Sequence, residues 1–182
     1  MPRNRPDEPW LSFLADLDAH HTEPADFHCI GGFVVSQYYG FARQTADLDV
    51  LTVIPNQLAE QVIQFAGKGS ALQKTYGVYV DYVRVADYPA DYEDRLIRAF
   101  PIWSKVRLWV LEPHDLALTK LSRSSQQDIN DVIFLAQANL INKDTLVARF
   151  ETEFDPYITG PTPTWHRTTL NMWIDSCWPP PQ

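Results

Sequence analysis

The stretch that decides the fold is residues 29–54, CIGGFVVSQYYGFARQTADLDVLTVI. A glycine pair, Gly31-Gly32, closes a short apolar strand and opens a segment of helical character. A second apolar strand follows, and it begins with two aspartates, Asp47 and Asp49. A strand that buries itself is not expected to start with two like charges, so the pair needs an explanation.

Successive side chains of a strand point to opposite faces, so Asp47 and Asp49 share one face, with their Cα atoms about 6.5–7 Å apart. The other face is expected to take Leu48, Val50, Thr52 and Ile54. Two carboxylates this close repel each other, and a hard divalent cation such as Mg²⁺ removes the conflict. The glycine pair adds backbone N–H groups that can approach phosphate oxygens at a helix start. Together these features predict a site for a nucleoside triphosphate and its metal ion at the rim of a sheet.

Composition bounds the class of protein. The chain has 182 residues, 45% of them hydrophobic, which is enough for one folded domain with a small subdomain. A net charge of −8 argues against nucleic-acid binding by bulk charge but leaves room for a local basic patch. The two cysteines, Cys29 and Cys177, are typical of a reducing compartment, and no apolar run is long enough to cross a membrane. We therefore expect a cytoplasmic protein.

Hydrophobic periodicity predicts about four strands with helices between them. Beyond residues 29–54, helices are expected over residues 7–20, 55–67, 91–100, 113–123, 125–136, 142–154 and 165–177, and strands over 27–30, 76–85 and 105–111. The predicted fold is α+β, close to α/β, with a small mixed sheet, helices packed on it and a helical C-terminal part. We expect a core over residues 1–112 and a helical subdomain over 113–182, with one single domain as the alternative.

A third carboxylate is predicted from the run YGVYVDYVRV, residues 76–85. Asp81 stands in its middle, where an unpaired charge would be costly to bury. Phosphoryl-transfer sites use a third acid to complete a metal site or to take the proton of the attacking hydroxyl, and Asp81 is the candidate for that role. The alternative is a solvated edge strand on which Asp81 pairs with Arg84 or a lysine.

The glycine pair followed by Asp-x-Asp resembles the nucleotidyltransferase superfamily typified by DNA polymerase β. Within it, the chain is similar to the abortive-infection (AbiEii-type) toxins and their uncharacterised relatives. The residues that carry this likeness are Gly31, Gly32, Gly40, Arg43, Thr45, Asp47 and Asp49. Residues 112–136, EPHDLALTKLSRSSQQDINDVIFLA, resemble a second segment of those relatives, so the likeness spans roughly residues 27–140.

The resemblance implies a transferase that uses Mg²⁺ or Mn²⁺ to move a nucleoside monophosphate from a triphosphate such as ATP to an acceptor hydroxyl or phosphate. The expected metal ligands and catalytic residues are Asp47, Asp49 and Asp81, and the expected nucleotide-binding residues are Gly31, Gly32, Arg43, Thr45, Lys120 and Arg123. Lys120 and Arg123 share one face of the helix predicted after Pro113, where a cation could hold the β- and γ-phosphates. Solvated surface positions are the alternative for both.

The acceptor is left open. The toxin branch implies RNA, such as a tRNA end, or a protein, together with an antitoxin partner. Small antibiotic nucleotidyltransferases, which act on aminoglycosides or lincosamides, are similar through the same Gly-Gly and Asp-x-Asp pattern, and an acidic chain suits a polycationic acceptor. A non-catalytic module that binds a nucleotide or a partner is the third reading.

Overall fold

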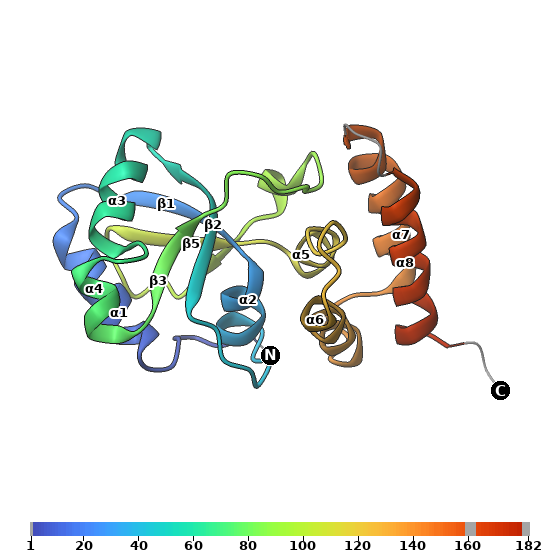
Figure 1. Ribbon diagram of the computed structural model, residues 1–182, viewed down its shortest axis with the longest axis horizontal. Coiled ribbons are helices and arrows are strands. Elements are labelled where there is room, and N and C mark those ends of the chain that lie inside the picture. Colours follow the sequence, from blue (N-terminus) through green and yellow to red (C-terminus); the bar gives the residue numbers. More distant parts are fainter. Residues whose placement is uncertain (1, 159–162, 180–182) are drawn as a thin grey trace. The chain divides into compact units, whose positions relative to one another are not determined.

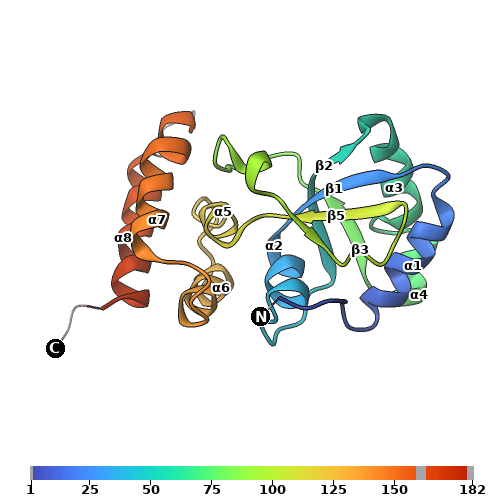
Figure 2. The ribbon, with the colours of Figure 1, turned by 180° about the vertical axis from the view of Figure 1, so that it is seen from behind.

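The computed structural model describes residues 2–158 and 163–179. The chain divides into two compact units, whose elements are drawn in Figures 1 and 2. The sheet unit consists of Met1–Arg84 and Leu96–Leu111, and the helical unit consists of Val85–Arg95 and Glu112–Gln182. Within the described residues, no helix is both long and apolar enough to cross a membrane.

The sheet unit is built on a five-stranded mixed sheet in the order β3-β2-β1-β5-β4. The strands are β1 (Ala25–Ile30), β2 (Asp47–Ile54), β3 (Tyr79–Tyr82), β4 (Ile97–Ala99) and β5 (Val106–Val110). β1 runs antiparallel to β2 and parallel to β5, whereas β2 runs parallel to β3, and β4 antiparallel to β5. The predicted mixed α/β fold with a helical C-terminal part is confirmed, with one strand more than expected.

One face of this sheet is buried under helices. Figure 1 shows α1 (Trp10–His20), α3 (Ala59–Ala66) and α4 (Ala71–Tyr76) gathered on one side of the strands. Apolar side chains of the strands and of α1 are almost fully buried: Trp10, Phe13, Leu14, Phe27, Leu48, Val50, Val80 and Leu108. Burying each side chain of this size contributes about 1.5–3 kcal/mol. We call the opposite side, which carries Asp47, Asp49, Tyr79 and Asp81, the polar face.

A β-bulge in β2 makes the alternation predicted for its second half wrong. The register of β2 against β1 shifts once, and Leu51 is the extra residue. Each bulge moves the residues after it to the other face of the sheet. Val53 is therefore buried, with 1% of its surface exposed, whereas Thr52 is only half-buried and Ile54 is 44% exposed. The two aspartates precede the bulge, and both keep the face predicted for them.

Two other segments differ from the predicted elements. Residues 91–100 are not a helix but a 3-10 turn (Tyr92–Arg95) followed by β4, because pairing with β5 outweighs the local helical periodicity. The strand predicted over residues 76–85 is confined to β3. α4 precedes it, capped by the Ser70 hydroxyl and ended by Gly77 in the left-handed conformation.

The helical unit contains α5 (Pro113–Leu118), α6 (Gln126–Gln137), α7 (Lys143–Arg149), a π-helical turn (Phe150–Phe154), a 3-10 turn (Asp155–Tyr157) and α8 (Pro163–Cys177). The predicted capping box of α6 is present: Ser125 and Asp128 each accept a hydrogen bond from the other's backbone N–H. Asn142 caps α7 as predicted. α5 ends five residues earlier than the predicted helix over 113–123, so Lys120 and Arg123 lie in the turn before α6.

Candidate active site

Three carboxylates lie together on the polar face of the sheet. β2 pairs with β3 in parallel, and the register places Asp49 directly opposite Asp81. Directly opposite residues of neighbouring strands point to the same face, and such strands lie about 4.8 Å apart. Asp47 lies two residues earlier in β2 and shares that face. The side chains of Asp47 and Asp49 are half-buried, and Asp81 is exposed. The pairing of β2 with β3 thus brings the three aspartates proposed from the sequence to one place.

Tyr79 is a further member of this group that the sequence reasoning missed. It pairs with Asp47 across β2 and β3, and it shares a face with Asp81 two residues on. Burial of the ring, followed by the negative charges of Asp47, Asp81 and Asp49, raises the pKa of Tyr79 above its ordinary value. The charges of all three carboxylates therefore act on the Tyr79 hydroxyl. Its position two residues before Asp81 in a strand is the sequence signal that could have identified it.

Gly31 is required because Asp49 lies against its backbone. Gly31 follows β1 and begins α2 (Gly31–Phe33), with a left-handed φ of +73°. A Cβ added at Gly31 would lie 2.0 Å from Oδ2 of Asp49, far inside any real contact. α2 continues into a π-helical turn (Val34–Tyr38), a feature often found at functional sites. Because Gly31 has no side chain, the Asp49 carboxylate can lie against the backbone at the start of α2.

Gly32 makes room for Arg43. A Cβ at Gly32 would lie 2.4 Å from Nη2 of Arg43, so the guanidinium covers the glycine. Thr45, two residues further on, donates a hydrogen bond of 2.7 Å from its hydroxyl to Oδ1 of Asp47. Arg43 and Thr45 both line a surface cavity of about 870 Å³ that also reaches α1 and the turn after α4. The loop between α2 and β2 thus joins the glycine pair to the first carboxylate.

Residues 12–167 match a family model described as a nucleotidyltransferase of unknown function (DUF6036). The chain belongs to this nucleotidyltransferase family. The match begins in α1 and ends in α8, so it includes elements of both units. No curated protein and no solved structure matches the chain. The family supports the superfamily predicted from the sequence, while membership of the abortive-infection toxin branch stays a prediction.

The donor chemistry of the three carboxylates suits a hard cation. Mg²⁺ prefers carboxylate oxygens and usually takes only one or two of them, leaving its other positions to water and phosphate. Asp47, Asp49 and Asp81 offer such oxygens on one face. Among the residues that the structure describes, no three His, Cys, Asp or Glu side chains are arranged closely enough to hold a metal ion by themselves. A metal ion held here would therefore need water or substrate oxygens among its ligands.

Lys120 and Arg123 belong to the helical unit of the nucleotidyltransferase, and both are bound to its carboxylates. Lys120 is 3% exposed, and its Nζ lies 2.7 Å from Oδ2 of Asp131 and 3.3 Å from Oδ1 of Asp128. Arg123 donates two hydrogen bonds to Asp128, at 2.8 and 2.7 Å. Burial raises the pKa of Asp128, but hydrogen bonds from Arg123 and Ser125 and the charge of Lys120 outweigh it and hold that pKa well below its ordinary value.

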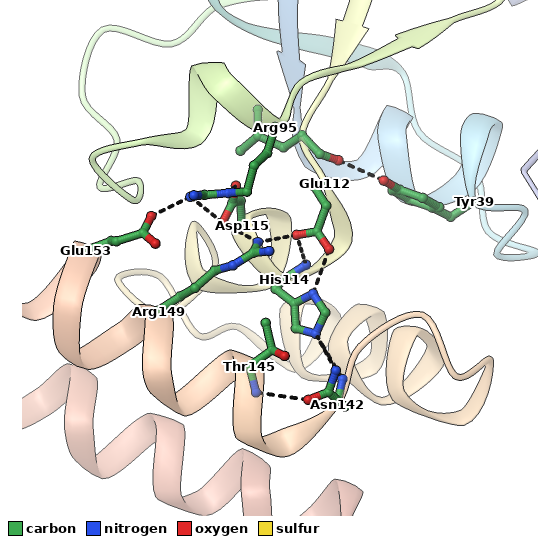
Figure 3. A network of polar contacts seen from close by, with 10 residues as sticks. Tyr39, Arg95, Glu112, His114, Asp115, Asn142, Thr145, Arg149 and Glu153 are labelled. Atoms are coloured by element: carbon green, nitrogen blue, oxygen red, sulfur yellow. Dashed lines mark hydrogen bonds and ion pairs between the residues drawn. The ribbon is translucent and has the colours of Figure 1, made fainter.

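A second ionic network of the helical unit surrounds the start of α5, as Figure 3 shows. The fully buried carboxylate of Asp115 accepts hydrogen bonds from Arg95, at 2.8 and 3.2 Å, and from Arg149, at 2.9 Å. Glu112 caps α5 by accepting from the backbone N–H of His114 at 3.0 Å, and it also binds Arg149. The network anchors residues 85–95 to α5 and α7, and it was not predicted from the sequence.

Proposed function

We propose that the protein is a metal-dependent nucleotidyltransferase that moves a nucleoside monophosphate from a triphosphate to an acceptor hydroxyl or phosphate. Asp47 and Asp49 are the proposed metal ligands. Asp81 is proposed as the third ligand or as the general base. The observation that carries the proposal is the register of β2 and β3, in which Asp49 faces Asp81 and Asp47 shares their side of the sheet.

Each residue of the site has a task in this reaction. Gly31 and Gly32 let the triphosphate approach the backbone at the start of α2. Arg43, over Gly32, offsets phosphate charge, and the Thr45 hydroxyl fixes the orientation of Asp47. Bound Mg²⁺ or Mn²⁺ would supply charge neutralisation at the phosphates and activation of the attacking oxygen. Lys120 and Arg123 are left out of the proposal, because their cationic groups already bind buried carboxylates.

Two acceptor classes have separate support. The resemblance to abortive-infection toxins supports RNA or protein as acceptor and an antitoxin as partner. The net charge of −8 supports a small polycation, as in aminoglycoside nucleotidyltransferases. A protein that binds a triphosphate without transferring it would be the third case, and it differs from both in leaving the α-phosphate on the nucleotide.

The test is a transfer assay with the full chain, Mg²⁺, and each of the four triphosphates labelled at the α-phosphate. Bulk RNA, a protein extract and a panel of aminoglycosides serve as acceptors. We expect label in one acceptor pool, and a loss of at least about 100-fold in Asp47→Asn and Asp49→Asn, because changing only the outer partners of metal ligands already costs about 10–100-fold. Asp175→Asn, an exposed carboxylate on α8, is the matched control.

Transfer that is equal in Asp47→Asn and in the control would exclude these carboxylates as metal ligands. A wild-type protein that binds a triphosphate but labels no pool would indicate the non-catalytic module. Growth inhibition on expression, lost in Asp49→Asn, would support the toxin role.

A further inference from the structure

A groove of about 850 Å³ runs between α3 and the free edge of β3. α3 supplies Glu60 and Ile63, and the turn after α3 supplies Lys68. β3 and the residues after it supply Asp81, Tyr82 and Arg84. All of these residues belong to the sheet unit. Val80, on the helix-covered face, lines the groove as well, so the groove lies along the edge of the sheet, and Asp81 is the residue that it shares with the carboxylates of the polar face.

The strand order places this groove on the acceptor side of the proposed reaction. Gly31 follows β1 and Asp81 lies on β3, and these strands flank β2 on opposite sides. In phosphoryl transfer, the attacking and leaving oxygens lie roughly in line on opposite sides of the phosphorus. A triphosphate whose β- and γ-phosphates lie at Gly31 therefore receives its nucleophile from the β3 side. On that side, Asp81 and the edge of β3 border the groove.

The charges of the groove favour an anionic acceptor. Lys68 and Arg84 are exposed, and neither forms an ion pair or side-chain hydrogen bond with any residue in the described ranges 2–158 and 163–179. If Asp81 binds the metal ion or accepts the proton of the acceptor hydroxyl, the other charged side chains of the groove are two cations, Lys68 and Arg84, and one carboxylate, Glu60. The half-buried ring of Tyr82 adds an apolar surface on which a sugar or base could lie.

We infer that this groove binds the acceptor, and that the acceptor carries a phosphate close to its reacting hydroxyl. The inference rests on the proposed function and narrows its acceptor. In the transfer, the acceptor oxygen forms a bond to the α-phosphorus, the bond from that phosphorus to the bridging oxygen breaks, and pyrophosphate leaves while the hydroxyl proton passes to a base such as Asp81. A polycation such as an aminoglycoside does not fit, because Lys68 and Arg84 would repel it.

The experiment measures binding rather than transfer, without triphosphate. The full chain is titrated against a fluorescein-labelled pentaribonucleotide over a range of salt concentrations, with ribose 5-phosphate and kanamycin as unlabelled competitors. The double variant Lys68→Ala/Arg84→Ala is compared with Lys74→Ala/Lys143→Ala, which removes two exposed lysines outside the groove. Both double variants remove two positive charges, the first at the groove and the second away from it, so a difference between them reports on the groove itself.

We expect the groove variant to bind the oligonucleotide at least about tenfold more weakly, with the slope of log K against log salt reduced by about 1.4, or 0.7 for each lost phosphate contact. The lysine control should match the wild type. Competition by ribose 5-phosphate would identify a small phosphorylated acceptor, and its failure to compete would identify a strand end. Equal binding by both variants, no binding by the wild type, or displacement by kanamycin but not by ribose 5-phosphate would overturn the inference.

Failure of this inference and failure of the proposed function are distinguishable. If Asp47→Asn keeps full transfer activity, the proposed function fails whatever the groove binds. If Asp47→Asn abolishes transfer while the groove variant matches its control, only the acceptor groove is wrong.

Discussion

Three aspartates of the helical unit and three of the sheet unit differ in burial. In the helical unit, Asp115, Asp128 and Asp131 are fully buried, and each lies within hydrogen-bonding distance of a lysine or an arginine. In the sheet unit, Asp47 and Asp49 are only half-buried and Asp81 is exposed; Asp47 accepts a hydrogen bond from the Thr45 hydroxyl, and Asp49 lies against the Gly31 backbone. The first arrangement neutralises charge for stability. The second places three carboxylates on an accessible face, where a cationic ligand could reach them.

The largest effect is expected at the buried cation of the helical unit. Lys120→Met leaves the carboxylates of Asp128 and Asp131 with a missing partner, and breaking a buried pair in this way costs about 3–5 kcal/mol. Hydrogen exchange in α6, followed by mass spectrometry, should detect the loss of stability. Triphosphate binding by the folded fraction should be unchanged. If Lys120→Met keeps its stability but loses affinity for the triphosphate, Lys120 binds the nucleotide, as the sequence resemblance implies.

Gly31→Ala is expected to have the next largest effect. A left-handed φ costs a non-glycine residue about 1–2 kcal/mol, and the new Cβ would also displace the Asp49 carboxylate. Gly77→Ala is a matched control, since Gly77 has a φ of +75° and nothing within 4 Å of an added Cβ. Urea unfolding should show a loss for both variants, larger in Gly31→Ala because of its contact with Asp49, while transfer activity should fall only in Gly31→Ala. Equal transfer activity in Gly31→Ala and Gly77→Ala would show that the position of the Asp49 carboxylate does not matter for the reaction.

Acid should weaken the helical unit through Asp128. Its folded-state pKa is depressed, so its contribution to stability is complete above the ordinary carboxyl value of 3.8 and is lost as the pH falls below it. Arg123→Ala removes one cause of that shift, and because Arg123 is 68% exposed we expect a loss of no more than about 1 kcal/mol at pH 7. Thermal unfolding between pH 2 and 7 should show a shallower acid dependence in this variant. An unchanged pH profile would mean that Lys120 and Ser125 suffice.

The smallest effect on stability is expected at the polar face. Asp47→Asn removes one of three neighbouring negative charges and keeps an oxygen to accept the Thr45 hydrogen bond. The free energy of unfolding should therefore stay within about 0.5 kcal/mol of the wild type or rise slightly. Asp131→Asn, in contrast, should destabilise the protein strongly. A marked loss of stability in Asp47→Asn would show that its charge supports the fold.

The sequence predicts most of the elements because their signals are local. The strand from Asp47 to Ile54, the capping box of α6 and the cap of α7 are specified by adjacent residues. The errors lie where distant pairing decides the outcome: β4 forms because β5 is beside it, and β2 changes face because β1 pairs with it in a shifted register. Local periodicity cannot reveal either partner.

The candidate site divides in the same way. Asp47, Asp49 and the glycine pair are close in the sequence, so a pattern identifies them. Tyr79 could have been identified from its position two residues before Asp81, whereas the groove beside β3 depends on strand order, which no short motif contains. For Lys120, the pattern gave the residue but not its surroundings, because the capping aspartate that binds it and Asp131 become neighbours only after α6 has folded.

The bulge in β2 has a consequence for how the site is aimed. Without Leu51, the residues of β2 (D-L-D-V-T-V-I) would alternate between the polar and the buried face without interruption. Leu51 is therefore an insertion into an otherwise regular strand pattern. A bulge bends its strand and strengthens the local right-handed twist. The direction in which the Asp47 and Asp49 carboxylates point is therefore set partly by Leu51, whose side chain takes no part in the proposed reaction. One extra backbone residue in β2 thus helps to define the geometry of the site.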